Sequence, residues 1–111
     1  DIFDIFTRQF YFGCEGDDPL ITLASETKGS PFEAKLCALY GSDLGHWDVP
    51  DMAEAAEEAY ELVDQGVLSA DAFRDMVFDN AVEFWTSGNR DFFKGTSVES
   101  ATTQLLASRS A

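Results

Sequence analysis

The sequence predicts an α/β fold organised around two parallel strands, and four observations lead to this prediction. The aromatic-rich residues 8–14 are typical of a strand, and the nearly continuous apolar run at residues 34–40 is typical of a strand buried on both faces of a parallel sheet. The segment between them is too long for a hairpin and long enough for a parallel crossover. From residue 51 onward, apolar side chains recur at helical spacing.

Local signals predict the elements around the two strands. Residues 1–7 are an apolar lead-in, either a helical turn or the end of another element, and residues 15–19 form a loop because acids stand there beside Gly and Pro. A short helix is expected at residues 20–28, with Pro19 at its start. Residues 29–31 then stop this helix before the second strand.

Two helices are predicted after the second strand. Residues 51–65 carry apolar side chains on one face and acids on the other, and Gly66 stands where such a helix ends. Ser69 is a suitable N-cap for a second helix. Residues 80–85 continue this helix or restart it after a bend.

Charge and composition narrow the classes of function. Seven basic and 21 acidic residues give a net charge of −14, which repels nucleic acid and anionic membranes, so we expect neither as a partner. No apolar run approaches the length of a membrane span and no secretory leader is recognised, so a cytoplasmic protein is expected. Cys14 and Cys37 stand in apolar segments and are expected to be free thiols, unless the two strands are neighbours in a suitable register.

Residues 39–51 hold the strongest functional signal, because an apolar strand stops there and polar residues crowd together before a helix begins. Asp43 comes just beyond the strand, where α/β proteins place catalytic groups. Its carboxylate can ligate a divalent metal or act as a general base. The plainer alternative, at least equally compatible with the sequence, is that Asp43 caps the following turn through its side chain.

Four more residues are candidates at the same edge of the sheet. His46 and Asp48 are close enough to interact, and a His-x-Asp pair can supply two metal ligands or a proton relay. Glu15 ends the other strand and would reach the same rim if the strands are parallel. Trp47 either covers an apolar substrate or packs the loop, and we favour packing. A structural His and solvated acids are the alternatives for the other three.

The segment Gly-Ser-Asp-Leu-Gly-His-Trp-Asp-Val-Pro-Asp at residues 41–51 resembles the carboxyl-terminal part of metal-dependent hydrolases of the amidohydrolase superfamily, of the amidohydrolase-related TIM-barrel type. Residues 10–19 resemble that family's seventh strand and loop, and residues 73–82 and 91–96 its closing helix and tail. The resemblance implies a partial barrel, made of the last two parallel β/α units of a TIM-barrel-like fold followed by C-terminal helices. In this interpretation residues 1–96 form the barrel segment with its closing helices, and residues 97–111 form a polar C-terminal tail expected to fray.

The resemblance also implies roles for individual residues. Asp43 would be the carboxylate after the eighth strand, which binds the catalytic divalent metal, expected to be zinc, or takes a proton from the attacking water. His46 and Glu15 would be rim residues near the substrate. The family's metal-binding histidines come from earlier strands, whereas His46 is the single His of this chain. A catalytic metal needs about three protein ligands, so the complete enzyme would hold the metal and this chain alone would hold none.

Three hypotheses follow. The chain is a C-terminal fragment of a metal-dependent hydrolase, and its partner is the missing N-terminal barrel portion. Alternatively, it is a truncated and catalytically inert module that assembles with copies of itself as a homo-oligomer. In the third hypothesis, Glu15, Asp43 and His46 form a local metal site. Ten Phe residues exceed what a small two-layer core can bury, so we expect several of them to meet another surface.

Overall fold

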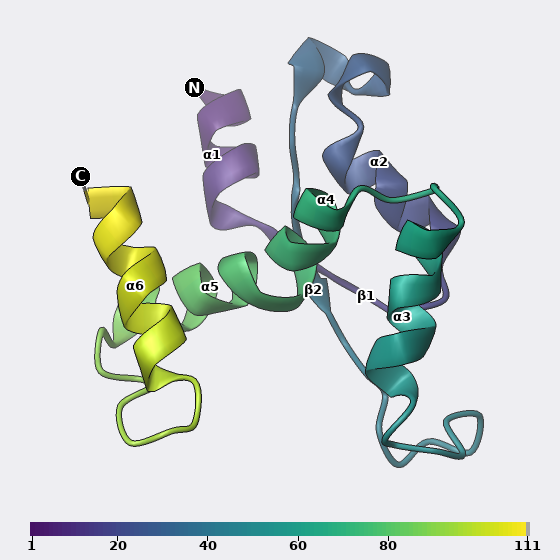
Figure 1. The fold of residues 1–111 in the computed structure, drawn as a ribbon. Helices are drawn as coiled ribbons and strands as arrows, with labels where there is room; N and C mark the ends of the chain where they lie inside the picture. Colours follow the sequence, from purple (N-terminus) through teal and green to yellow (C-terminus); the bar gives the residue numbers. More distant parts are fainter. Residues whose placement is uncertain (111) are drawn as a thin grey trace.

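A computed structural model describes residues 1–110 and shows helices arranged around a two-stranded sheet (Figure 1). Strands β1 (Tyr11–Cys14) and β2 (Cys37–Tyr40) are parallel neighbours, with Tyr11 opposite Cys37 and Cys14 opposite Tyr40. The predicted parallel pair joined by a crossover is therefore confirmed. The strands are shorter than predicted, because residues 8–9 belong to a helix and residues 34–36 lie outside the ladder.

The elements before and between the strands are short. Helix α1 (Ile2–Gln9) begins at Asp1, whose carboxylate accepts a hydrogen bond from the backbone N–H of Phe3. The lead-in is thus a helix with its own N-cap. The crossover holds four short helical segments, of which Asp18 caps the first: η1 (Pro19–Ile21), α2 (Thr22–Ser25), η2 (Thr27–Gly29) and η3 (Pro31–Glu33).

The second half of the chain is helical. Helix α3 (Ala55–Asp64) is followed by Gly66 at φ 71°, the left-handed conformation that ends many helices. The Ser69 hydroxyl accepts a hydrogen bond from the N–H of Ala72 and starts a continuous helix. Its parts are α4 (Ala70–Arg74), the π-helical turn η4 (Asp75–Asp79) and α5 (Asn80–Gly88).

Helix α6 (Glu99–Ser110) occupies the segment that was expected to fray. Thr102 and Leu105 on this helix are buried, and Arg109 pairs with Asp79 of the long helix. Two buried side chains and one ion pair therefore hold this helix against the rest of the molecule, although its small and polar residues show no amphipathic pattern.

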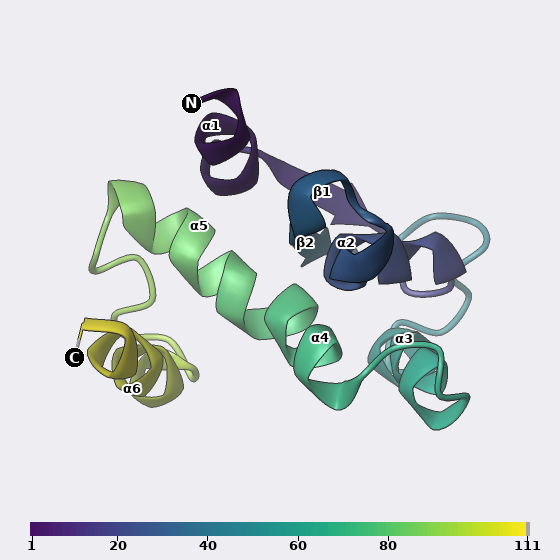
Figure 2. The same ribbon diagram turned by 90° about the horizontal axis from the view of Figure 1, so that it is seen from above.

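The long helix α4–η4–α5 separates the sheet from α6, while α3 lies near its α4 end (Figure 2). The Asn80 amide of the long helix donates to the carbonyl of Ala38 in β2 at 2.9 Å, and Asp75 of the same helix pairs with Lys35, just before β2. The apolar core lies where β2, α3, the long helix and the crossover meet. It contains Ile21, Ala38, Leu62, Leu68 and Met76.

The structure shows a mixed α/β fold with a small parallel sheet, and the predicted partial TIM barrel is not seen. Among residues 1–110 the sheet has two strands of four residues each. A barrel segment needs tilted strands that curve around a shared interior, which one short pair does not provide. The expectation that β2 is buried on both faces is also wrong, because Ala38 is its one buried residue.

The molecule is flat and open for its size. Its extents are 40 × 39 × 23 Å and its radius of gyration is 14.9 Å, whereas a compact domain of this length has about 13 Å. The helices are short, and within residues 1–110 none has both the length and the apolar character that a membrane crossing requires. Several aromatic side chains stay exposed, as the surplus of Phe predicts: Phe6, Phe10, Phe32, Phe84 and Phe92.

Candidate metal centre

The carboxyl ends of both strands meet at one edge of the molecule. The backbone N–H of Gly41 donates to the carbonyl of Cys14 at 2.8 Å, so the strands stay paired up to their last residues. An open cavity of about 490 Å³ follows, lined by the backbone of the strand ends and by acidic side chains. The structure brings Glu15 and Asp43 to this one cavity, as the parallel arrangement predicts.

A tight turn after β2 shapes the site. Asp43 has φ 50°, a left-handed conformation that Asp adopts more readily than most residues, and Gly45 has φ 93°. The N–H of His46 donates to the carbonyl of Asp43 at 3.1 Å and closes the turn. The chain therefore folds back, so that residues 43 and 46 face each other.

Three side chains of this turn form a compact cluster, which we call the Asp43 cluster: Asp43, His46 and Asp48. Nδ1 of His46 lies 3.1 Å from Oδ2 of Asp43 and 2.5 Å from Oδ1 of Asp48. One potential ligand atom from each residue lies within 4.8 Å of the others. The carboxylate of Asp43 thus contacts an imidazole instead of capping the turn. Asp48 takes the third place that the local-site hypothesis assigned to Glu15.

The two carboxylates favour the protonated form of the imidazole. The hydrogen bond with Asp48, and then the negative charges of Asp43, Asp48 and Glu15, raise the pKa of His46 above its ordinary value. The same hydrogen bond lowers the pKa of Asp48. A divalent cation has the same sign as the imidazolium proton and would replace it between the two carboxylates.

The surroundings of the Asp43 cluster are strongly acidic. Residues 43–64 contain eight acidic side chains and no Lys or Arg. Beside the cluster, Asp48 and Asp51 continue into an open groove of about 530 Å³ that is lined by four glutamates of α3 and its start: Glu54, Glu57, Glu58 and Glu61. Such a concentration of negative charge raises the local concentration of cations.

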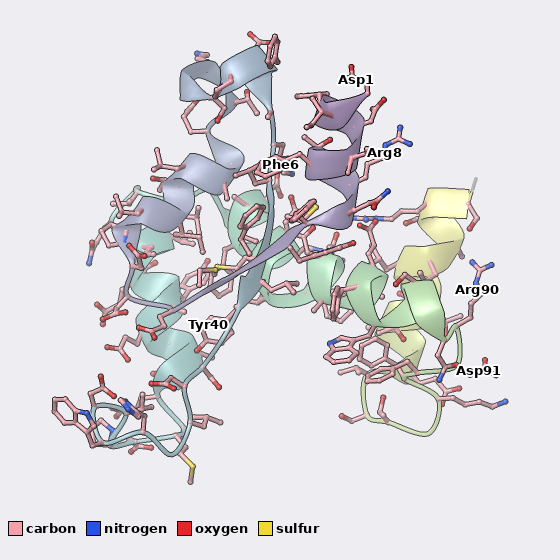
Figure 3. All side chains as sticks on the ribbon, turned by 180° about the vertical axis from the view of Figure 1, so that it is seen from behind. Asp1, Phe6, Arg8, Tyr40, Arg90 and Asp91 are labelled. Atoms are coloured by element: carbon pink, nitrogen blue, oxygen red, sulfur yellow. The ribbon has the colours of Figure 1, made fainter. Side chains whose placement is uncertain are left out.

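Contacts with α3 hold the strand ends in place. The hydroxyl of Tyr40 donates to the carbonyl of Ala55 at 2.8 Å, at the first turn of α3 (Figure 3). Gly16 lies so close to α3 that a Cβ built on it would be 2.8 Å from the Cβ of Ala59. The loop after β1 and the end of β2 are therefore both anchored on the same helix.

Trp47 does not pack the loop, contrary to the interpretation we favoured. Its side chain is 85% exposed, and its nearest aromatic neighbour is the ring of His46, at 6.2 Å between centroids. The tight turn that brings His46 back to Asp43 leaves the next side chain pointing into solvent. Trp47 is available for an external contact.

Both cysteines are free thiols. Their strands are neighbours, but Cys14 and Cys37 stand three register positions apart, which separates them by about 10 Å along the strand direction and rules out a bridge. Burial raises the pKa of each thiol, and Cys14 donates to the carbonyl of Leu39. Raised pKa values disfavour the thiolate, so neither sulfur is an activated nucleophile.

Some residues that line the site carry little signal in the sequence. Asp18 lines the cavity beside Glu15 and also caps η1. The clustering of Asp18 with Glu15 in the acidic loop after the first strand is the sequence signal that places it at this rim. Gly13 and Gly41 line the cavity through their backbone, so no pattern of side chains in the sequence predicts their place in the site.

Comparisons with known proteins identify no relatives. No protein-family model matches the sequence, and neither the curated proteins nor the solved structures contain a significant match. The resemblance to the amidohydrolase superfamily therefore stays a prediction, and the function must be argued from the site itself.

Proposed function

We propose that this chain contributes a divalent-metal site to a metal-dependent hydrolase, with Asp43, His46 and Asp48 as its protein ligands. The observation that carries the proposal is the Asp43 cluster, in which ligand atoms of all three residues converge within 4.8 Å just beyond a parallel strand. Three protein ligands are the number that catalytic zinc sites use. The position matches the edge where α/β enzymes gather their catalytic groups.

The donor set fits a divalent metal such as zinc. One imidazole nitrogen and two carboxylate oxygens are ligands that zinc accepts, and the left-handed turn already aims them at a common point. A bound zinc ion would supply a Lewis acid that polarises a substrate carbonyl and lowers the pKa of water. His46 must lose its proton for this, so binding strengthens as the pH rises.

The acidic residues on the other side of the cavity indicate which substrate groups the proposed site would bind. Glu15 and Asp18 line the same cavity as Asp43 but come from the other strand end. In a hydrolase they would orient a cationic or hydroxyl-bearing group of the substrate. Trp47, exposed beside His46, would cover an apolar part of it.

We further propose that more parallel strands lie beside the sheet, supplied by another segment or another chain. Parallel sheets are normally buried on both faces and have more than two strands. Here β1 and β2 have no other strand neighbour among residues 1–110, and Phe6 and Phe10 are exposed next to β1. Additional strands would cover this surface and bring the remaining catalytic groups.

Equilibrium dialysis of the purified chain against zinc, followed by metal analysis, tests the proposed site. Wild type should retain about one zinc per chain. Asp43→Asn should abolish retention, and because Asn also tolerates the left-handed conformation, the loss would report the missing charge. Asp51→Asn is the matched control from the same acidic loop and should retain zinc like wild type. Absence of zinc in wild type, or equal zinc in wild type and Asp43→Asn, would contradict the proposal.

A further inference from the structure

A ladder of aromatic rings crosses the surface at the far end of the long helix. The ring centroids of Tyr11 and Phe84 are 5.0 Å apart, and those of Phe84 and Trp85 are also 5.0 Å apart. Trp85 stacks on Phe92, with 4.9 Å between the ring centroids and 12° between the ring planes. Phe92 in turn meets Phe93 edge-on at 5.0 Å. We call these five residues the aromatic face.

The rings of the aromatic face contact one another and remain partly open to solvent. Trp85 is 48% exposed, Phe92 44% and Phe84 38%, although the rings contact one another along the whole ladder. Such pre-formed aromatic surfaces lose little conformational entropy when a partner covers them, and Trp and Tyr are enriched among the residues that dominate binding energy. The face therefore has the character of an interface.

The charge distribution indicates which partner can approach. Residues 80–111 contain three acidic and three basic side chains, whereas residues 1–79 contain 18 acidic and four basic ones and so carry the entire net charge of −14. Two identical chains would repel strongly if their acidic parts met. Contact through the neutral C-terminal part avoids this repulsion.

The area of exposed surface also suits self-association. The chain exposes 7821 Å², whereas a folded monomer of 12.2 kDa exposes about 6,100 Å². The excess of about 1,700 Å² exceeds the roughly 800 Å² that each partner buries in an interface of standard size. The chain as a whole therefore exposes enough surface for an interface of standard size.

We propose that the aromatic face is the docking surface for a second copy of this chain, in a twofold symmetric dimer. A twofold interface needs a patch that complements itself. Arg90 and Asp91 (Figure 3) directly precede Phe92 in the sequence, so this part of the chain carries one charge of each sign that can meet its opposite on the other copy. The face includes Tyr11, at the amino end of β1, whereas the Asp43 cluster follows the carboxyl end of β2, so the dimer does not depend on the proposed metal site.

Sedimentation velocity and light scattering of the purified chain, from micromolar to millimolar concentration, test this proposal. The wild type should form a species of twice the 12.2 kDa chain mass. Trp85→Glu should weaken the dimer by at least about tenfold, and Trp47→Glu should not, because this second exposed Trp lies on the acidic loop. A monomer throughout the range, or a dimer that Trp85→Glu leaves intact, would overturn the proposal.

A second measurement needs no disruptive substitution. In the Trp47→Phe variant Trp85 is the single Trp, so its fluorescence reports on the aromatic face alone. Acrylamide quenching should fall as the concentration passes through the dimerisation range, because the second copy shields the ring. Quenching that stays constant while the mass doubles would show that the copies meet elsewhere and would overturn the proposal.

Discussion

At the scale of single residues, the turn after β2 accounts for the candidate site. Asp43 has a left-handed backbone conformation, which is unfavourable for most residues, and this conformation turns its carboxylate toward the imidazole of His46. Strained backbone positions cluster at functional sites, and this one lies within a group of potential ligands. The arrangement also raises the pKa of His46, the one His in the chain.

The first prediction concerns the protonation state of His46. Because Asp48 and Asp43 stabilise the imidazolium, His46 should titrate above its ordinary pKa of 6.5 in NMR spectra of the folded chain. Asp48→Asn should move the midpoint down, since it removes the first and largest cause of the shift. Asp51→Asn serves as the control and should leave the midpoint unchanged. A midpoint at or below the ordinary value would contradict the described cluster.

The same shifts fix how the cluster affects stability as the pH changes. Because the pKa of His46 is raised in the folded chain, its contribution to the free energy of unfolding is complete below pH 6.5. That contribution is lost as the pH rises through the pKa of the folded state. Because the pKa of Asp48 is lowered in the folded chain, its contribution to the free energy of unfolding is complete above pH 3.8. That contribution is lost as the pH falls through the pKa of the folded state. The cluster should therefore stabilise the fold most between these two ordinary values. Urea denaturation of wild type and His46→Gln, over this range and at alkaline pH, measures the difference in stability, which should vanish at alkaline pH.

At the scale of elements, the contact between the β1 loop and α3 gives the second prediction. A methyl group on Gly16 would lie 2.8 Å from the Cβ of Ala59 and 3.2 Å from the ring of Tyr40. Gly16→Ala should therefore destabilise the fold by about 1–3 kcal/mol, as overpacking typically does. Gly13→Ala is the matched control, since nothing lies within 4 Å of the place that its methyl group would take. Equal urea midpoints for the two variants would refute this packing.

The attachment of α6 gives the third prediction. The carboxylate of Asp79 is nearly buried and accepts hydrogen bonds from Arg74 at 3.2 Å and from Arg109 of α6 at 3.3 Å. Asp79→Ala should cost about 2 kcal/mol, because it removes two charge-assisted hydrogen bonds. Hydrogen exchange should then accelerate in α6 more than in α3. Asp64→Ala, which removes an acid at the end of α3, should leave both helices protected as in wild type.

The elements that could be predicted are those with strong local signals. The two apolar runs predict the two strands. Gly66 predicts the end of α3, and Ser69 predicts the start of the long helix. Helix α6 could not be predicted, because its order depends on partners distant in the sequence, such as Asp79 for Arg109. The strand lengths were overestimated for a related reason, since apolar character alone does not show where backbone pairing stops.

The candidate site was predictable in its position and only partly in its composition. The end of β2 was singled out because an apolar run stops there at Asp43, and the pairing of His46 with Asp48 follows from their spacing. The exposure of Trp47 was missed, because it depends on the left-handed turn that redirects the chain. Asp and Gly tolerate such a turn, but their presence does not specify it.

At the scale of the whole molecule, the core is small and the exposed surface is large, so we expect association to add to the stability of the chain. Several of the buried apolar residues are alanines, which contribute little burial energy: Ala34, Ala38, Ala55 and Ala59. The fourth prediction is that the melting temperature rises with protein concentration, since a dimer of folded chains is favoured by mass action. Differential scanning calorimetry over a hundredfold dilution series measures this. Trp85→Glu should remove the concentration dependence.

The central claim is that Asp43, His46 and Asp48 bind a divalent metal together. The most direct measurement follows the His46 imidazole resonances during zinc titrations at neutral and at alkaline pH, because loss of the imidazolium proton favours metal binding. We expect a shift that saturates near one equivalent of zinc in wild type and is absent in Asp43→Asn. Resonances that stay unchanged with excess zinc, or that shift equally in Asp43→Asn, would contradict the claim.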